Sequence, residues 1–268
     1  MKEAAVGIFD SGVGGLSVWR ELIKVLPAEE FLYVSDNAYC PYGRKSASEI
    51  IERAYLITDF LISKGVKLVV VACNTATAAA IDALRLKYPK TPFVGMEPAV
   101  KPAALHSETG VIGVLATNGT FSGKLYNRTL EKFASDVKVI EQRGDGLVEV
   151  VESGDINSDT TYKLIKKYID PMVDSGADCI VLGCTHYPFL AKQISDIAGD
   201  KIKIIDPAPA VAIQTKNILT ERGILAESVK KSLKRTLFFS TGDITGLKNL
   251  AISIVPEISE DDFLKLNI

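Results

Sequence analysis

Two segments of the chain repeat one pattern, in which an apolar strand ends on a cysteine. The copies span residues 64–75 and 175–186, with Cys73 and Cys184 at equivalent places. Each copy predicts a buried strand followed by a polar residue that can begin a helix. The repeat therefore constrains the fold to two halves of similar topology. It also allows two thiols to face one ligand from opposite sides, which suits moving a proton from one face of a carbon to the other.

Strand-like runs alternate with amphipathic segments along almost the whole chain. The expected strands are residues 5–10, 31–35, 68–73, 93–96, 111–116, 137–142, 179–184, 202–206 and 237–240. The expected helices are residues 17–26, 46–64, 76–88, 123–133, 158–175, 188–198 and 210–222. Because apolar, often β-branched strands alternate with helices, we expect an α/β protein with mainly parallel sheets that are covered on both faces.

A second similarity extends the repeat. Strand-like runs end at Ser11 and at Thr117, with nearly the same separation as the two cysteines. Proline-containing breaks near residues 97–102 and 206–209 mark the points where the chain leaves the first half and returns to it. We expect one domain from residues 1–97 plus 208–268, and a second from residues 98–207.

Composition excludes several classes of protein. The formal net charge is −2, so no basic surface indicates a nucleic-acid partner. The apolar runs are far shorter than the roughly 20 residues that span a bilayer, and the N-terminal residues do not resemble a signal peptide. We therefore expect a cytoplasmic protein that is not bound to a membrane.

The four cysteines are expected to be free thiols, as is usual in a reducing compartment. No structural zinc site is predicted, because His106 and His186 lack the spacing of zinc ligands. Cys179 lies inside a strand-like run and is interpreted as a core residue. Cys40 lies in a turn and is expected to be half exposed, with no catalytic role.

Three motifs follow predicted strands, where ligands bind in open α/β sheets. The first is the glycine-rich turn at residues 10–15. Its backbone N–H groups suit a substrate carboxylate, although glycine is also used in a plain tight turn. The spacing is not that of a dinucleotide-binding loop. Asp10 can cap a helix, or it can take up a proton in the cleft.

The second and third motifs contain the repeated cysteines. Cys73 at a helix N-terminus can have a pKa below the ordinary value of about 8.5, and Asn74 and Thr75 supply donors for a carboxylate. A buried structural cysteine is the alternative. Cys184 is followed by Thr185 and His186, an imidazole that exchanges protons near pH 7. A lone histidine is more often structural, which is our interpretation of His106.

Weaker candidates support these motifs. Pro41, Tyr42 and Gly43 form a turn that can close over a ligand, or that serves only as a turn. Further polar residues can act as helix caps, turn starters or surface charges, or they can contribute to the site. These residues are Thr117, Thr120, Asp36 and Glu152.

Together, the segments 10–11, 41–43, 73–75 and 183–186 resemble the glutamate racemases of bacterial cell-wall synthesis. The resemblance covers the whole chain and implies two pseudo-symmetric three-layer α/β domains with the active site in the interdomain cleft. It implies no cofactor, glutamate as the substrate, a homodimer, and a supply of D-glutamate for peptidoglycan and hence for cell shape.

The resemblance also assigns roles to residues. Cys73 and Cys184 are the implied acid/base pair, with Asp10 and His186 as their proton partners. Asp36 and Glu152 are implied supporting acids. The implied substrate contacts are Asp10, Ser11, Pro41, Tyr42, Gly43, Asn74, Thr75, Thr117, Thr120, Thr185 and His186.

Our hypothesis is a two-base proton transfer on glutamate. Several alternatives stay open from the residues alone: a racemase for aspartate or a related amino acid, a non-catalytic module that binds an acidic amino acid, a cysteine hydrolase, and a racemase that uses pyridoxal phosphate. The presence of two thiols speaks against the last two. His186 favours glutamate over aspartate, because aspartate racemases usually carry glutamate at that position.

Overall fold

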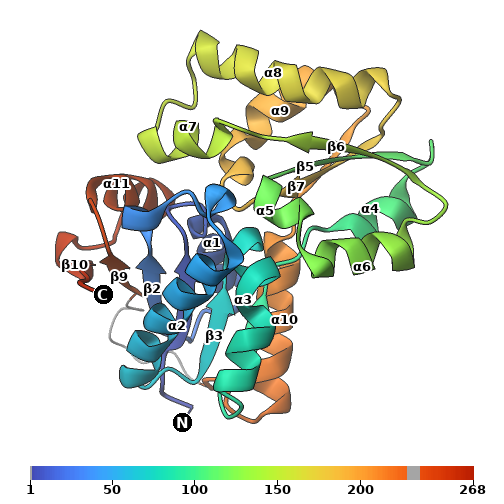
Figure 1. The fold of residues 1–268 in the computed structure, drawn as a ribbon. Helices are drawn as coiled ribbons and strands as arrows, with labels where there is room; N and C mark the ends of the chain where they lie inside the picture. The colour runs from blue at the N-terminus through green and yellow to red at the C-terminus, as the bar shows by residue number, and fades with distance from the viewer. Residues whose placement is uncertain (1, 228–235) are drawn as a thin grey trace.

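The computed structural model describes residues 2–227 and 236–268, and it is built on two parallel β-sheets. The first sheet has the strand order β10-β9-β2-β1-β3-β4, and the second has the order β6-β5-β7-β8 (Figure 1). Neighbouring strands run parallel in both. The expected α/β fold with parallel sheets is confirmed. Residues 1 and 228–235 of the predicted first domain lie outside the described residues.

The strands are short and mostly buried. Those of the first sheet are β1 (Val6–Asp10), β2 (Phe31–Ser35), β3 (Leu68–Val71), β4 (Phe93–Gly95), β9 (Thr236–Ser240) and β10 (Phe263–Lys265). Those of the second are β5 (Val111–Ala116), β6 (Lys138–Arg143), β7 (Cys179–Gly183) and β8 (Lys203–Ile205). All nine expected strands are present, with ends that shift by one or two residues. Strand β10 was not expected.

Helices cover both faces of each sheet. The α-helices are α1 (Leu16–Val25), α2 (Ala47–Ser63), α3 (Asn74–Lys87), α4 (Val100–His106), α5 (Asn118–Phe121), α6 (Lys124–Phe133), α7 (Leu147–Ser153), α8 (Asp159–Asp174), α9 (Ala191–Ala198), α10 (Ala208–Glu221) and α11 (Thr245–Ile254). The 3-10 helices are η1 (Asn37–Tyr39), η2 (Tyr42–Arg44), η3 (Tyr187–Leu190) and η4 (Glu260–Asp262). In the second sheet, α8 and α9 lie on one side and α4 and α6 on the other (Figure 1).

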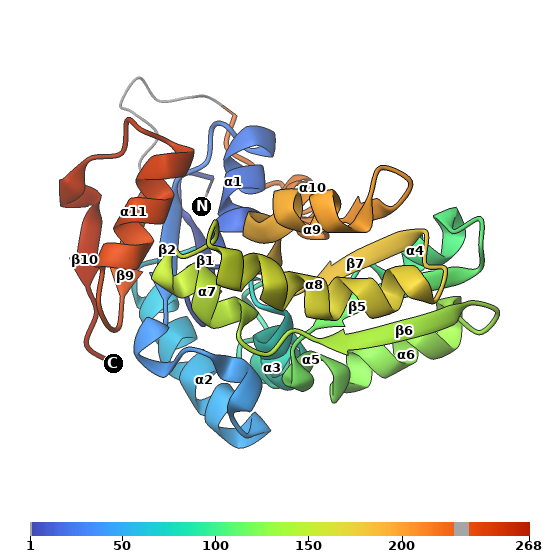
Figure 2. The same ribbon diagram turned by 90° about the horizontal axis from the view of Figure 1, so that it is seen from above.

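In the first sheet, α2 and α3 lie on one side and α1 and α11 on the other (Figure 2). Helix α2 shows why these segments form helices. Ser46 and Glu49 make a reciprocal capping box at its start, and Ile50, Ile57 and Leu61 are buried on one face. Among the helices of the described residues, none combines the length and apolar character needed to cross a bilayer.

The two halves share a topology. The spatial order is β2-β1-β3-β4 in the first sheet and β6-β5-β7-β8 in the second. In both, the strand that comes second along the chain lies at one edge of these four, followed by the first, the third and the fourth. Cys73 follows β3 and Cys184 follows β7, so the cysteines occupy equivalent places. The second sheet uses strands from residues 111–205, after which α10 packs on α1 of the first half. The exact domain boundaries, 97/98 and 207/208, stay a prediction.

The segments after the two cysteines differ. Cys73 is the N-cap of α3, where its Sγ accepts the Ala76 N–H at 3.4 Å. After Cys184 the chain forms the 3-10 helix η3, and α9 begins only at Ala191. The prediction of one continuous helix over residues 188–198 is therefore wrong in its first turn. The two helices are separate because Leu190, with φ −103° and ψ 5°, lies outside the α-helical region.

Candidate active site

Both repeated cysteines line one small cavity at the carboxyl ends of strands from the two sheets. Cys73 is 5% exposed and Cys184 is 7% exposed, so both thiols are buried against the cavity. The cavity is lined by Ser11, Pro41, Tyr42, Gly43, Cys73, Asn74, Thr75, Thr117, Val148, Cys184, Thr185 and His186. The residues that the repeat and its flanking motifs single out thus come together from both halves. Val148, from α7, lines the cavity but was not predicted.

Asp10 lies behind the Cys73 thiol, at the end of β1. The thiol donates to Ser11 Oγ at 3.8 Å, and Ser11 Oγ donates to Asp10 Oδ1 at 3.4 Å. Complete burial raises the pKa of Asp10 above its ordinary value. Burial, and then the charge of Asp10, raise the pKa of Cys73 well above the ordinary thiol value.

The sequence-based expectation of a lowered Cys73 pKa is therefore wrong for this conformation. Its N-cap position at α3 does supply the Ala76 N–H, which acts to lower the pKa. Desolvation is the larger effect, because the thiol is enclosed by both halves of the protein. Cys73 is accordingly a protonated thiol, ready to donate.

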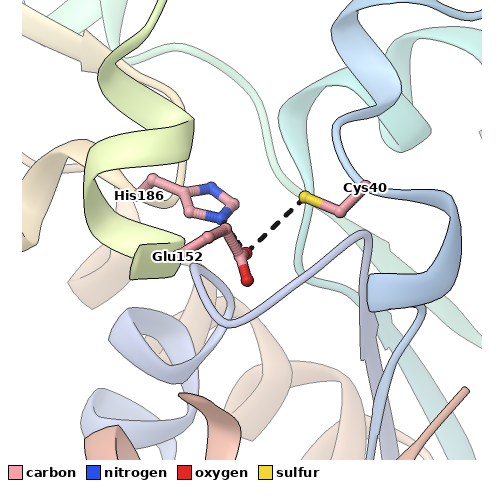
Figure 3. A group of neighbouring side chains, drawn as sticks. All are labelled: Cys40, Glu152 and His186. Carbon is pink, nitrogen blue, oxygen red and sulfur yellow. Dashed lines mark hydrogen bonds and ion pairs between the residues drawn. The ribbon is translucent and has the colours of Figure 1, made fainter. Parts of the chain in front are cut away.

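His186 lies between Cys184 and the carboxylate of Glu152, and Figure 3 shows its contact with Glu152. Its Nδ1 lies 3.7 Å from Cys184 Sγ, and its Nε2 lies 2.6 Å from Glu152 Oε1. Burial acts to lower the pKa of His186, but hydrogen bonds to Cys184, Cys40 and Glu152 outweigh burial and raise it well above its ordinary value. The pKa of Glu152 is lowered, because contact with His186 outweighs burial. A positively charged imidazole thus faces Cys184.

The cavity has a polar lining to which both halves contribute. Both side-chain polar atoms of Asn74 are buried without a hydrogen-bond partner among the described residues. Thr75 Oγ1 and Thr117 Oγ1 share a hydrogen bond of 2.8 Å between the halves, and Thr117 Oγ1 lies 3.1 Å from Thr120 Oγ1. Thr185 Oγ1 donates to Asp10 Oδ2 at 3.4 Å. Since an unsatisfied buried amide costs free energy, Asn74 indicates a polar ligand in the cavity.

Asp36 does not line the cavity. It forms a buried ion pair with Arg53, at 2.8 Å, and accepts the Tyr42 hydroxyl at 2.5 Å. The role of Arg53 was not predicted, because an arginine on an amphipathic helix is usually a solvent-exposed charge. Asp36 therefore supports the site through Tyr42, whose ring lines the cavity.

The backbone N–H groups of the glycine-rich turn at residues 10–15 bind side chains of the protein. The Val13 N–H donates to Glu152 Oε1 at 2.8 Å, and the Gly15 N–H donates to Asp10 Oδ2 at 2.7 Å. A Cβ atom on Gly14 would lie 2.3 Å from His186 Nδ1. The turn thus holds carboxylates of the protein itself, and glycine allows its backbone to approach His186.

Cys40 and Cys179 differ in their surroundings. Cys179 is buried in β7, as expected. Cys40 is half-buried, also as expected, but its Sγ lies 3.6 Å from Glu152 Oε1 (Figure 3). Nothing in the local sequence could indicate that this turn meets α7, because more than a hundred residues separate Cys40 from Glu152. His106 lies in α4 and is not among the described residues that line the cavity.

The sequence profile of the Asp/Glu/Hydantoin racemase family matches residues 7–215. A glutamate racemase from Ectopseudomonas mendocina is 48% identical over 242 residues, which are 90% of this chain and 91% of the relative. The chain belongs to the Asp/Glu/hydantoin racemase family, among its glutamate racemases. Racemases are isomerases, so the protein is an enzyme of that class.

Solved structures of glutamate racemases have the same fold. One from Bacillus anthracis has a TM-score of 0.88 at 32% identity, over 100% of this chain and 98% of the other. One from Francisella tularensis, in complex with D-glutamate, has a TM-score of 0.84 at 27% identity, with the same coverage. One from Escherichia coli, in complex with L-glutamate and the activator UDP-MurNAc-ala, has a TM-score of 0.85 at 31% identity, over 98% of each chain.

Proposed function

We propose that this racemase interconverts L-glutamate and D-glutamate by moving the Cα proton between two cysteines. The observation that carries the proposal is that the thiols of Cys73 and Cys184 line one small cavity from equivalent positions in two halves. The related enzymes from Francisella tularensis and Escherichia coli were solved with D-glutamate and L-glutamate, respectively. These two ligands are the substrate and product of the proposed reaction.

In one direction Cys184 acts as the base. The positive charge of His186 beside it, held by Glu152, stabilises a Cys184 thiolate. This thiolate takes the proton from Cα, and the thiol of Cys73 delivers its proton to the opposite face. The product then leaves with Cys184 protonated and Cys73 as a thiolate. The reverse direction starts from that second form, and Asp10 and Ser11 provide its proton path.

The intermediate carbanion has to be stabilised by the chain. Its charge is delocalised toward the α-carboxylate, so donors around that group lower the barrier. The unpaired amide of Asn74 is the strongest candidate. The other proposed substrate contacts are Asp10, Ser11, Pro41, Tyr42, Gly43, Thr75, Thr117, Thr120, Thr185 and His186. With this arrangement the reaction needs no pyridoxal cofactor as an electron sink.

Several wider features follow the same proposal. The enzyme supplies D-glutamate for peptidoglycan in the cytoplasm, and it works as a homodimer. The cavity lies between a first domain of residues 1–97 plus 208–268 and a second of residues 98–207. These statements draw support from the family membership and from the way the lining residues divide between the two sheets.

The activity is tested with the purified protein after extensive dialysis. Circular dichroism of L-glutamate should decay to zero as the racemic mixture forms, with L-aspartate at the same concentration decaying far more slowly. Added pyridoxal phosphate should not change the rate. Faster turnover of aspartate, or a requirement for pyridoxal phosphate, would overturn the proposal. Ligand binding without loss of optical activity would identify a non-catalytic module.

A further inference from the structure

A third thiol lies beside the His186–Glu152 pair, and the proposed reaction does not use it. Cys40 Sγ is 3.6 Å from Glu152 Oε1, which is 2.6 Å from His186 Nε2. One donor atom from each of the three side chains lies within 4.8 Å of the others. The residues come from three separate segments, the turn after η1, helix α7 and the segment after β7, and they converge on one point (Figure 3).

The donor set is the one that zinc and similar soft divalent cations prefer. Thiolate sulfur, imidazole nitrogen and carboxylate oxygen bind Zn²⁺ at about 2.0–2.3 Å, so tetrahedral ligand atoms lie roughly 3.3–3.8 Å apart. The distance of 3.6 Å between Cys40 Sγ and Glu152 Oε1 already fits this range. The shorter contact between His186 Nε2 and Glu152 Oε1 is a hydrogen bond, and it has to open by less than about 1 Å when an ion replaces its proton.

The site is both held in place and reachable. The Val13 N–H fixes the Glu152 carboxylate at 2.8 Å, while the Glu152 side chain remains 23% exposed. Cys40 is half-buried, whereas His186 is buried. An ion can therefore arrive from solvent along Cys40 and Glu152 and meet the imidazole from the side opposite to Cys184.

We propose that Cys40, Glu152 and His186 form a binding site for a soft divalent cation such as Zn²⁺, and that its occupation inhibits the enzyme. Three protein ligands leave a fourth position for water, as in other open zinc sites. This proposal departs from the expectation of no metal site. That expectation concerned ligands at short spacing, and a cluster assembled from three distant segments has no such spacing.

Inhibition follows from what the ion does to His186. When the ion binds Cys40 Sγ and His186 Nε2, the thiol proton and the Nε2 proton are released to solvent. The ion also replaces the hydrogen bond between Glu152 and the imidazole. His186 is then no longer an imidazolium, so it loses the positive charge that stabilises the Cys184 thiolate in the proposed reaction. This second half of the proposal rests on the proposed role of His186 in racemisation, whereas metal binding itself does not.

Binding is measured on the intact enzyme with Cd²⁺, because cadmium–thiolate bonds give an ultraviolet charge-transfer absorption. Inhibition is measured with Zn²⁺, each variant being compared with its own metal-free rate. The test variant is Cys40→Ser, and the matched control is Cys179→Ser, which removes a buried thiol away from the cluster. Cys184→Ser is included in the binding measurement, because a cation could instead use Cys184 and His186.

Cys40→Ser should weaken Cd²⁺ binding and relieve Zn²⁺ inhibition by roughly tenfold or more, since loss of even an indirect partner of a metal site costs 10–100-fold. Cys179→Ser and Cys184→Ser should retain the absorption. A Cys40→Ser variant that binds Cd²⁺ as tightly as the unmodified enzyme would overturn the site. Binding through Cys40 without inhibition would overturn the inhibitory role. Since the absorption does not depend on turnover, the site can be judged even if glutamate is not the substrate.

Discussion

His186 contacts a thiol through one ring nitrogen and a carboxylate through the other, and the chemistry of the second half depends on this pairing. Cys73 has a different partner, the buried carboxyl group of Asp10, which it reaches through Ser11 and whose pKa burial raises. At the scale of single residues, the two thiols therefore share a position in the fold but differ in their proton partners. Cys184 lies beside an imidazole, and Cys73 lies beside a buried carboxyl group that it reaches through a hydroxyl.

The charge on His186 gives a prediction for pH dependence. The groups facing its ring are Glu152, Cys184 and Cys40, and Asp10 also acts on it through its charge. Glu152 raises the pKa of His186, so His186 stays protonated to higher pH than a free imidazole. In Glu152→Gln this pKa should fall, and the alkaline limb of kcat/KM for the direction that uses Cys184 as base should move to lower pH.

Glu149→Gln is the matched control for this experiment. Glu149 lies on the same helix, α7, but pairs with the exposed Arg44 at 2.7 Å. The alkaline limb of kcat/KM for Glu149→Gln should coincide with that of the unmodified enzyme. An unshifted limb in Glu152→Gln would contradict the assignment of Glu152 as the group that keeps His186 charged.

At the scale of elements, the turn between β1 and α1 is where the backbone approaches the catalytic side chains. A Cβ atom at Gly14 would meet the ring of His186. Gly14→Ala should therefore displace His186 and lower kcat by about 100-fold, as expected for a misplacement near 1 Å. The comparison is steady-state kinetics with Gly246→Ala, whose added Cβ would meet its nearest neighbour at an ordinary 3.4 Å.

Both variants should remain folded, which circular dichroism and thermal unfolding will verify. Equal activity of Gly14→Ala and Gly246→Ala would show that the turn does not position His186.

Helix α2 is tied to the end of β2 by the Asp36–Arg53 pair. Both side chains are buried, and Asp36 also accepts hydrogen bonds from Tyr42 and Thr241. Arg53→Leu leaves the Asp36 charge without its cation, so the free energy of unfolding in urea should fall by about 3–5 kcal/mol. The exposed Arg44–Glu149 pair provides the control, and Arg44→Leu should cost less than about 1 kcal/mol. Similar losses in the two variants would mean that Asp36 is stabilised by its hydroxyl partners alone.

Elements that combine length with a clear pattern could be predicted from the sequence. The apolar runs that became β3 and β7 end beside the cysteines, as their pattern predicts. Helix α4, helix α11 and strand β10 were not predicted. Helix α11 nevertheless carries a helical signal, because the exposed polar residues Thr245, Asn249 and Ser253 recur every four residues. The 3-10 segment η3 differs from the expected α-helix because the backbone leaves the α-helical region at Leu190.

At the scale of the whole molecule, the repeat predicted the two-sheet arrangement and the equivalent places of the two cysteines. Most other residues of the cavity were predicted from the motifs beside the strands and from the family resemblance. What it could not predict are contacts between segments far apart in the chain. Arg53 beside Asp36 and Cys40 beside Glu152 depend on how helices and turns are placed in space. The pKa of Cys73 also depends on enclosure by both halves, which a helix-start motif does not reveal.

The molecule as a whole presents one thiol from each half to a shared cavity. The hydrogen bond between Thr75 and Thr117 joins the halves at the cavity lining. If each thiol serves one face of Cα, then removing one should leave the other able to exchange its own face. Isotope exchange at Cα should therefore report on each thiol separately, although racemisation requires both thiols.

The most direct measurement is deuterium incorporation at Cα from D₂O, with L-glutamate and D-glutamate supplied separately to Cys73→Ser and Cys184→Ser. Racemisation should fall by about 10²–10⁴-fold in both variants. Exchange without inversion should persist for one enantiomer in Cys73→Ser and for the other in Cys184→Ser. Racemisation at the unmodified rate in either variant, or exchange of the same enantiomer by both, would contradict the two-thiol account.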